Sequence, residues 1–487
     1  MKSAKTLGLI LGDLLSDDSL MGEAIGGLSL DSRRVSRGDL FFAYPGLVAD
    51  GRTYITEAIE HGASVVVYEA EGADIPETGM IPAVAVNGLR EKVGIIAERF
   101  FGNPGQDLFI IGITGTNGKT SCAHLLAQAF EALGVHAAII GTLGWGFVHK
   151  LHKAQLTTPD PVSLHCMLHD VHALGATHVC MEVSSHALVQ GRVSGVSFDA
   201  ALFTNLTHDH LDYHDDIADY AAAKKILFEF PTLRCAVINR DDDFGKELAS
   251  RVTAPTWTFG VSQGDVTARS VEAGVSGLDV VLDSKAGPID THARLVGRIN
   301  LHNILAVVAV LLADGSTAAM AAEAIDRLEP VPGRMELFQK TKSAGPSVVV
   351  DYAHTPDALE RALSSIREHC TGRVWCVFGC GGDRDRTKRP VMGAIAERLA
   401  DEIVVTDDNP RHEAPGDITD EIVAGMTASP TVINDRVQAI RWAINHALVE
   451  DWILIAGKGH EDTQQVGDRF VNMDDRSIVN SCLEVTV

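Results

Sequence analysis

The stretch LFIIGITGTNGKT, residues 108–120, decides the fold of this 487-residue chain. Its first part, residues 108–113, is an apolar run typical of a buried strand, and residues 114–120 are a glycine-rich turn. Apolar residues then recur at helical spacing over residues 125–133, and Gly134 ends the pattern. A strand, a glycine-rich turn and a helix in this order are the parts of a phosphate-binding loop.

The turn predicts a site for nucleotide phosphates and Mg²⁺. Glycines let backbone N–H groups face phosphate oxygens, and the helix N-terminus adds positive potential. Lys119 would neutralise the terminal phosphates, while the Thr120 hydroxyl would ligate Mg²⁺. The strict Walker pattern has a glycine where this chain has Ile113, so the loop is a variant. The alternative is a glycine-rich turn with an incidental lysine, which the flanking strand and helix disfavour.

The composition disfavours several classes of protein. Hydrophobic residues make up 46% and charged residues 22%, which is typical of a globular chain. Lys and Arg total 41 against 65 Asp and Glu, so the net charge of −24 disfavours nucleic-acid and anionic membrane partners. The apolar helical stretch at residues 304–313 is about half the ~20 residues that cross a bilayer, so we expect no membrane insertion. Eight scattered cysteines without a C-x-x-C pair indicate a reducing compartment, and we expect a cytoplasmic protein.

The pattern of elements predicts an α/β protein of three domains. Strand-like runs rich in Val and Ile alternate with helical patterns, which favours largely parallel sheets. Clusters of Gly and Pro at residues 101–105 and 329–334 indicate the boundaries. We therefore predict domains at residues 1–105, 106–331 and 332–487, with the phosphate loop on the central sheet.

Polar residues that follow two apolar runs suggest a metal site. Glu182 ends one run, and His208, His210 and His214 follow another within seven residues. Three histidines allow a zinc interpretation. Mg²⁺ is favoured, because a nucleotide site is built on hard oxygen ligands to which Glu182 and one histidine would add. For His208 and His214 we favour a solvated, hydrogen-bonding loop.

Four strands are predicted in the last third of the chain, at residues 347–350, 374–378, 403–405 and 452–456. Each runs into a polar loop rich in glycine or charge. In an open parallel sheet, ligands bind outside the carboxyl ends of the strands. We therefore expect the four loops to converge on one cleft.

The motifs at these positions closely resemble those of the Mur ligase family, and the similarity covers nearly the whole chain. The motifs are LDSR at residues 30–33, DGR at 50–52, GTNGKT at 115–120, EVSSH at 182–186, DHLD at 209–212, DYAH at 351–354, GCGGDR at 379–384, DNPR at 408–411 and GKGHE at 457–461. The variant phosphate loop is also what this family carries. Residues 47–49 depart from the more polar loop of many relatives.

The resemblance implies a ligase with an amino-terminal UDP-sugar domain, a central ATPase domain and a carboxyl-terminal Rossmann-like domain that receives an amino acid. ATP would convert a substrate carboxylate to an acyl phosphate, and an amine would displace phosphate to form an amide. The branch it resembles adds meso-diaminopimelate to UDP-N-acetylmuramoyl-L-alanyl-D-glutamate in peptidoglycan synthesis. The implied partners are these small molecules, and we expect a monomer.

The resemblance also assigns roles to individual residues. Lys119, Lys224 and His210 would be catalytic. The residues that contact ATP would be Gly115, Thr116, Asn117, Gly118, Lys119, Thr120, Asn303, Arg334 and Asp351. The UDP-muramoyl dipeptide would be held by Leu30, Ser32, Thr157, Thr158, Ser184, Gln190 and Arg192. Diaminopimelate would be held by Arg384, Asp408, Asn409, Pro410, Arg411, Gly457 and Glu461. The Mg²⁺ ligands would be Thr120, Glu182, His210 and Lys224.

Lys224 lies where the family carries a lysine carbamylated by CO₂. An ammonium cannot ligate Mg²⁺, whereas a carbamate supplies an anionic oxygen. Composition alone favours a surface lysine on an Ala-rich helix, an interpretation that suits the neighbouring Lys225.

Two other ligases of the superfamily are alternatives, one that adds lysine and one like folylpolyglutamate synthase, and the DNPR motif at residues 408–411 argues against both. A protein that binds ATP through its phosphate loop without ligating anything is a third alternative.

Overall fold

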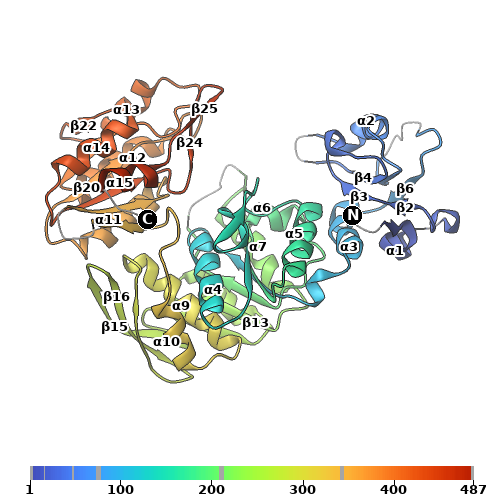
Figure 1. Ribbon diagram of the computed structural model, residues 1–487, viewed down its shortest axis with the longest axis horizontal. Coiled ribbons are helices and arrows are strands. Elements are labelled where there is room, and N and C mark those ends of the chain that lie inside the picture. Colours follow the sequence, from blue (N-terminus) through green and yellow to red (C-terminus); the bar gives the residue numbers. More distant parts are fainter. Residues whose placement is uncertain are drawn as a thin grey trace. The chain divides into compact units, whose positions relative to one another are not determined.

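The computed structural model describes residues 4–15, 17–46, 49–72, 78–207, 213–340 and 345–483. The chain divides into two compact units, residues 1–258 and 259–487 (Figure 1). The first unit contains the phosphate loop, and the second contains the four predicted carboxyl-terminal strands. This division lies inside the predicted central domain, and the two boundaries between the three predicted domains stay a prediction.

The amino-terminal part of the first unit is a parallel sheet in the order β3-β4-β5-β6. Its elements are α1 (Leu7–Leu11), β3 (Gly27–Ser29), β4 (Asp39–Ala43), α2 (Ile55–Glu60), β5 (Val65–Glu69), β6 (Ala83–Val86) and α3 (Leu89–Phe101). Side chains alternate along the strands, so that Phe42 packs with α1 and α3 while Phe41 packs with α2. Helices therefore cover both faces, as a parallel sheet requires.

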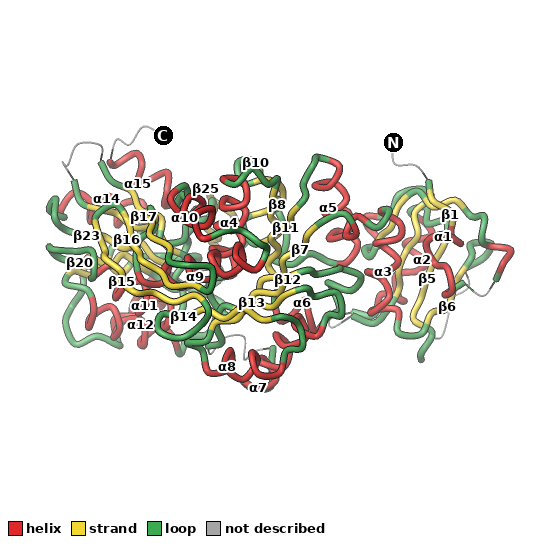
Figure 2. Tube along the Cα trace, turned by 90° about the horizontal axis from the view of Figure 1, so that it is seen from below, coloured by secondary structure: helices red, strands yellow, loops and turns green. Residues whose placement is uncertain are grey.

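The central sheet of the first unit has the strand order β10-β9-β8-β11-β7-β12-β13. Its strands are β7 (Phe109–Thr114), β8 (Ala137–Gly141), β9 (Gly144–Phe147), β10 (Lys150–His152), β11 (His178–Glu182), β12 (Ala200–Phe203) and β13 (Cys235–Asn239). Five strands from β8 to β13 run parallel and lie side by side, and β9 and β10 add an antiparallel edge (Figure 2). The predicted parallel sheet around the phosphate loop is confirmed.

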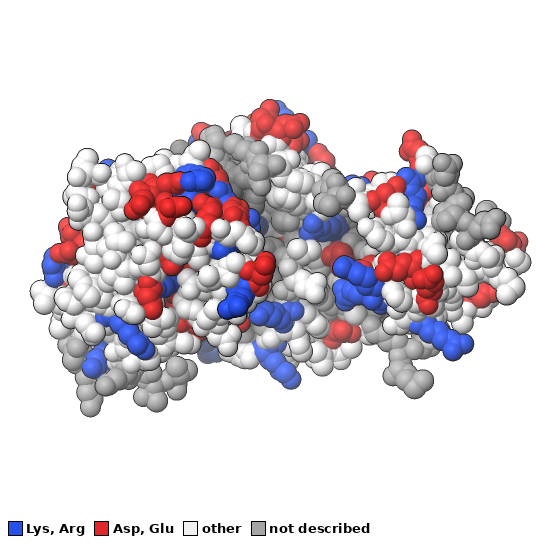
Figure 3. Space-filling view, turned by 90° about the horizontal axis from the view of Figure 1, so that it is seen from above, with Lys and Arg blue, Asp and Glu red and all other residues white. Residues whose placement is uncertain are grey.

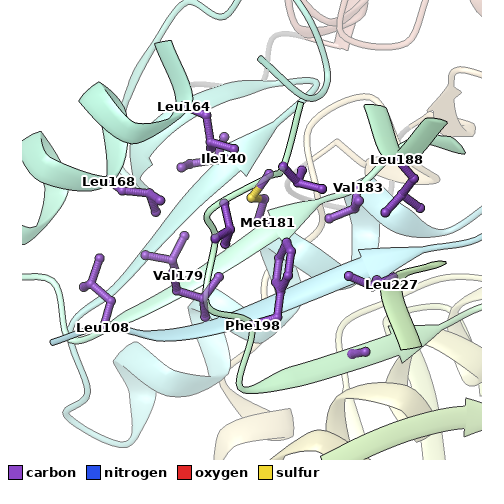
Figure 4. Packing of buried hydrophobic residues seen from close by; sticks show 14 of the residues in the cluster. Leu108, Ile140, Leu164, Leu168, Val179, Met181, Val183, Leu188, Phe198 and Leu227 are labelled. Carbon is purple, nitrogen blue, oxygen red and sulfur yellow. The ribbon is translucent and has the colours of Figure 1, made fainter. Parts of the chain in front are cut away.

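Helices cover both faces of this central sheet. They are α4 (Lys119–Ala132), α5 (Pro161–Ala173), α6 (Ser185–Val189), α7 (Ile217–Lys225) and α8 (Asp243–Arg251). Leu164 and Leu168 of α5 lie over Ile140 and Val179 in a core that Leu227 also enters (Figure 4). Helix α4 packs on the other face, against β7, β8 and β11. The strands are apolar on both sides because both sides are buried.

Helix α3 packs closely on the backbone that follows α6. A Cβ atom at Gly94 would lie 1.8 Å from the carbonyl oxygen of Ser194, so a larger residue cannot occupy this position. The same carbonyl oxygen accepts a hydrogen bond from Nε2 of the buried His165, at 3.1 Å. This contact joins the amino-terminal sheet to the central sheet within the first unit.

The division between the two units falls within β14 (Thr256–Gly260), so that the second unit begins at Phe259. Strands β15 (Val266–Gly274), β16 (Gly277–Ser284) and β17 (Ile289–Ala293) pair antiparallel. Helices α9 (Arg298–Ala313) and α10 (Ala318–Asp326) follow them. The side chain of His369 joins this part to the last sheet, because Nε2 accepts from the Gly297 N–H at 2.9 Å and Nδ1 donates to the Gly274 carbonyl at 2.7 Å.

The last sheet has the order β18-β19-β23-β20-β21-β22 and is parallel apart from β18. Its strands are β18 (Glu336–Phe338), β19 (Ser347–Asp351), β20 (Val374–Phe378), β21 (Glu402–Val405), β22 (Thr431–Val432) and β23 (Trp452–Ala456). The helices are α11 (Pro356–Arg367), α12 (Lys388–Leu399), α13 (Pro415–Val423), α14 (Arg436–His446) and α15 (Asp475–Leu483), and β24 (Thr463–Val466) pairs with β25 (Arg469–Asn472) as a hairpin. Helices α11 to α13 cover one face, and α14 and α15 cover the other.

Charged side chains of both signs lie on the surface. On the face drawn in Figure 3, Lys and Arg side chains lie in separate groups among Asp and Glu side chains. Across the described ranges, no helix is both long enough and apolar enough to cross a membrane.

Candidate active site

The phosphate loop lies between β7 and α4, and residues that follow β12 hold it in place. The backbone N–H of Thr116 donates to the Asn205 carbonyl at 2.8 Å, and that of Asn117 donates to Oδ1 of Asn205 at 2.9 Å. At Gly115 the φ angle is +147°, and a Cβ atom would lie 1.9 Å from Oγ1 of Thr204. Glycine is therefore required at position 115, both for the backbone conformation of the predicted turn and because no space is left for a side chain.

Two ammonium groups contact the carbonyl oxygen of Gly115. Nζ of Lys119 donates to it at 2.8 Å and to the carbonyl of Thr116 at 2.8 Å. Nζ of Lys224 donates to the Gly115 carbonyl at 2.9 Å and lies 4.0 Å from the ring centre of Tyr220. The fold therefore brings both side chains to the loop, where the charge of Lys119 would help to hold a polyanionic ligand.

Lys224 is 1% exposed, so the interpretation as a surface lysine is wrong for this residue. That interpretation fits Lys225, whose Nζ forms an exposed ion pair with Glu229 at 2.8 Å. Burying a lysine is costly unless its charge is compensated. The buried Lys224 therefore suits a role in the site better than the role of a surface lysine that keeps the chain soluble.

Glu182 lies beside the phosphate loop because the end of β11 pairs with the end of β7, in the register Glu182 to Ile113. Its side chain is 1% exposed. The carboxylate accepts hydrogen bonds from Oγ1 of Thr120 at 2.9 Å and from the N–H and hydroxyl of Thr142 at 2.7 and 3.1 Å. A buried carboxylate next to a hydroxyl is a pair of hard oxygen donors, and it fits Mg²⁺.

The remaining predicted metal ligand, His210, lies outside the described residues, as does His208. Over the ranges that are described, no group of three or more His, Cys, Asp or Glu side chains is arranged to hold a metal.

His214 corrects the prediction of a solvated loop. Its side chain is 2% exposed, and its two ring nitrogens lie 2.9 Å from Oδ2 of Asp219 and 3.0 Å from Oγ of Ser185. It therefore joins α7, which carries Lys224, to the start of α6. Sequence reasoning missed this because burial depends on how two distant segments pack.

Most of the residues predicted for the muramoyl dipeptide lie next to Glu182. Oγ1 of Thr157 is 3.0 Å from Oγ1 of Thr142, and Oγ1 of Thr158 donates to the Glu182 carbonyl at 2.9 Å. The Ser184 N–H donates to Thr158 at 3.1 Å.

Arg192 and Gln190 complete this group. Nη1 of Arg192 donates to the Thr158 carbonyl at 3.1 Å, and its Nε donates to Oε1 of Gln190 at 2.8 Å. The five predicted residues, Thr157, Thr158, Ser184, Gln190 and Arg192, are thus one connected group.

Leu30 and Ser32 lie elsewhere, in a cavity of about 530 Å³ in the amino-terminal sheet. The Ser32 hydroxyl donates to Glu57 at 2.6 Å, and Tyr44 also lines the cavity. The structure therefore separates the residues predicted for the uridine end from those predicted for the peptide end, as an extended ligand requires.

In the second unit, Arg334 and Asp351 lie close together. The Arg334 guanidinium is 4.5 Å from the ring centre of Tyr352. Asp351 accepts from the backbone N–H groups of Met335 at 2.7 Å and Ala353 at 2.8 Å, and burial raises its pKa against the lowering effect of the Arg334 charge. Asn303 is on α9, where its amide donates to Asn300 at 2.9 Å.

The strand-end loops lie close together as predicted, and the cleft that they would form stays a prediction. A Cβ atom at Gly381 would lie 2.8 Å from Nη1 of Arg411 and 3.7 Å from Cγ of Arg384. A Cβ atom at Gly457 would lie 2.6 Å from Oδ2 of Asp408, which joins a third loop to the pair.

The loops are locally strained at two residues of this cluster. Arg411 and Asp383 have φ angles of +51° and +52°. Left-handed backbone at residues other than glycine is costly, and it gathers at functional sites. Nη1 of Arg411 also donates to the Gly382 carbonyl at 2.7 Å, so its guanidinium is held at the loop that carries Arg384.

Two fully buried cations, Lys458 and Arg389, support these loops. Hydrogen bonds from Arg389 lower the pKa of Glu413 to about 2. Burial alone would raise the pKa of Glu461, but the hydrogen bond and charge of Lys458, together with the hydrogen bond from Asn409 and the charge of His460, outweigh burial and lower the pKa. Lys458 lies inside the GKGHE motif, but only the packed structure shows what it contacts.

The sequence matches three Mur ligase domains: the Mur ligase family catalytic domain over residues 24–101, the Mur ligase middle domain over 113–311 and the Mur ligase glutamate ligase domain over 333–459. The chain belongs to the Mur ligase family. It is similar to the UDP-N-acetylmuramoyl-L-alanyl-D-glutamate–2,6-diaminopimelate ligases of Coxiella burnetii, at 45% identity over 93% of this chain and 94% of that protein, and of Pseudomonas aeruginosa, at 47% over 90% and 91%.

Solved structures also support membership of the Mur ligase family. A solved diaminopimelate ligase with the same name superposes with a TM-score of 0.73 and 32% identity, covering 99% of both chains. The Thermotoga maritima MurF ligase in complex with ADP shares the fold, with a TM-score of 0.65, 18% identity and coverage of 94% and 96%.

Within this Mur ligase, three residues of the two sites carried no signal in the sequence. They are Thr142, Tyr220 and Arg389, which lie outside the motifs of the family. Each contacts a predicted site residue or its loop, through contacts that only packing creates.

Proposed function

We propose that the chain joins meso-diaminopimelate to UDP-N-acetylmuramoyl-L-alanyl-D-glutamate with consumption of ATP. The observation that carries the proposal is the cluster of Arg384 and Arg411 at Gly381, beside Asp408 of the loop after β21 and Glu461 of the loop after β23. Two guanidinium groups and two carboxylates match an amino acid that has carboxylates and ammonium groups at both ends. The relatives at 44–47% identity carry the name of this activity.

In the first step, the free carboxylate of the dipeptide nucleotide attacks the terminal phosphorus of ATP, and ADP leaves. Lys119 offsets the repulsion between the carboxylate and the triphosphate, and the backbone N–H groups of the loop hold phosphate oxygens. Thr157, Thr158, Ser184 and Arg192 would hold the peptide end next to this loop. In the second step, the amine attacks the acyl carbon and phosphate leaves.

Thr120 and Glu182 would hold Mg²⁺, together with His210 and Lys224 as a carbamate. When bound, the ion would neutralise charge on the phosphates and orient them. Asn303, Arg334 and Asp351 would contact the nucleotide. We expect the enzyme to act in the cytoplasm as a monomer, since it would use soluble nucleotide substrates.

The selectivity for diaminopimelate would come from Arg411. A guanidinium meets a carboxylate with two parallel hydrogen bonds, whereas it repels the ammonium at the far end of lysine. The proposal therefore includes rejection of lysine by both a missing contact and a repulsion.

The test supplies the purified chain with ATP, Mg²⁺ and the dipeptide nucleotide, with either meso-diaminopimelate or L-lysine. We expect ADP release coupled to a product of the mass of the diaminopimelate adduct, and a rate with lysine at least about 100-fold lower. Equal rates with lysine would favour the lysine-adding alternative. ADP release without an amide product would favour a protein that only binds and hydrolyses ATP.

A further inference from the structure

Lys458 is a fully buried cation at the end of β23, and it contacts three different segments. Its Nζ donates to Oδ1 of Asn409 at 3.1 Å, to Oε2 of Glu461 at 2.8 Å and to the carbonyl of Thr463 at 2.7 Å. These acceptors lie on the loop after β21, on the loop after β23 and at the start of β24. A lysine ammonium has three donors, so all three are used.

The Asn409 amide has one orientation in this network. Its Oδ1 accepts from Lys458 and from the backbone N–H of Gln465 at 2.9 Å, and its Nδ2 donates to Oε2 of Glu461 at 2.9 Å. An amide turned by 180° would place its NH₂ group against an ammonium and an N–H. Lys458 and the Gln465 N–H therefore fix the orientation in which Nδ2 of Asn409 donates to Glu461.

The same ammonium fixes the Glu461 carboxylate. Over the described residues, the hydrogen bonds to this carboxylate come from Lys458 and Asn409 and both end on Oε2. Oε1 is thereby left to accept from a ligand, and the side chain is 33% exposed while that of Lys458 is buried. A fixed carboxylate with one open oxygen is a preorganised acceptor for an ammonium group.

We propose that Lys458 is a positioning residue that fixes the Glu461 carboxylate, directly and through Asn409, so that its open oxygen Oε1 can accept from an ammonium group of the incoming amino acid. The proposal rests on the proposed function. Lys458 itself does not contact the ligand, because its three donors are used within the protein. Removing it should weaken amino-acid binding and leave the nucleotide sites unchanged.

The experiment measures KM for diaminopimelate, ATP and the dipeptide nucleotide in the full chain, for the wild type and Lys458→Met. Lys246→Met is the matched control, because Lys246 is on α8 in an exposed pair with Asp243. We expect Lys458→Met to raise the diaminopimelate KM about 10- to 100-fold and to change the other two KM values less than about twofold. Equal rises in all three KM values, or no rise, would overturn the proposal.

A second pair of variants separates positioning from general support of the fold. Lys458→Arg keeps the charge and should recover part of the diaminopimelate KM. Glu461→Gln should raise the diaminopimelate KM of the wild type. In Lys458→Met it should raise this KM less than about twofold, because both changes remove the same ion pair of Lys458 with Glu461. Additive effects would overturn the proposal, as would failure of both Lys458 variants to fold in thermal melting.

The wild-type measurement distinguishes this result from the proposed function. If the wild type forms an amide with diaminopimelate while Lys458→Met behaves like the control, only the role of Lys458 fails. If the wild type forms no such amide, the proposed function fails, and the role of Lys458 fails with it.

Discussion

The phosphate loop of the first unit and the strand-end cluster of the second both hold lysine or arginine side chains by hydrogen bonds, but with different acceptors. Lys119 and Lys224 both donate to the carbonyl oxygen of Gly115. Lys458 and Arg389 instead form ion pairs with Glu461 and Glu413. Lys119 lies at the N-terminus of α4 beside a glycine-rich turn, so the first arrangement suits a ligand with several negative charges.

The second arrangement suits a ligand of mixed charge. Its carboxylates are held by buried cations, and Arg411 and Arg384 lie beside them at Gly381. Such a site is organised before the ligand arrives, which lowers the entropic cost of binding. The comparison predicts that mutations in the first unit act on turnover and that mutations in the second act on amino-acid affinity.

The largest expected effect is that of Lys119→Ala. Without this cation the carboxylate and the triphosphate repel each other, so we expect ligation to fall at least about 1000-fold. Thermal melting should stay near the wild-type value, because the residue lies at a surface loop and not in a core. Lys225→Ala is the control and should keep full activity. Ligation at the wild-type rate would contradict the role of the phosphate loop.

The next effect is that of Lys224→Ala, which should lower turnover about 100-fold or more by removing an anionic oxygen of the carbamate. Chloride or short carboxylic acids should restore part of the activity, because they supply the missing negative charge. Intact-protein mass in bicarbonate should show the added CO₂ on the wild type only. A fully active wild type with an unmodified Lys224 would exclude the carbamate.

Arg411→Ala should act on affinity. We expect the KM for diaminopimelate to rise roughly 30-fold or more, because a desolvated carboxylate loses its guanidinium partner. The KM for ATP should change far less, which would separate the second region from the first. An unchanged diaminopimelate KM would mean that Arg411 only braces the turn at Asp408 to Pro410.

The smallest effect concerns the pH dependence of stability at Glu413. Its pKa in the folded chain is lowered from 4.5 to about 2, so the pair with Arg389 stabilises the fold fully above pH 4.5 and less as the pH falls toward about 2. Glu413→Gln should therefore unfold at lower urea concentration than the wild type at pH 7, and this difference should narrow below pH 4.5. Glu360→Gln, in an exposed pair with Arg398, is the control. A difference that does not change with pH would contradict the assignment.

Local patterns predicted much of the fold. The strand, turn and helix at residues 108–134 became β7, the phosphate loop and α4, and the four carboxyl-terminal runs became β19, β20, β21 and β23. Such predictions succeed because hydrophobic periodicity and glycine positions depend on neighbouring residues. The family resemblance added the candidate site residues, whose roles stay predictions.

The sequence by itself determined the strand ends, the loop that would bind phosphate and the family to which the chain belongs. Only the tertiary structure decided that His214 is buried, that Lys224 lies at Gly115 and that Lys458 joins Asn409 to Glu461. The physical reason is that these contacts join segments brought together by the order of strands in a sheet. Sheet order follows from the packing of the whole domain, and no short stretch of sequence encodes it.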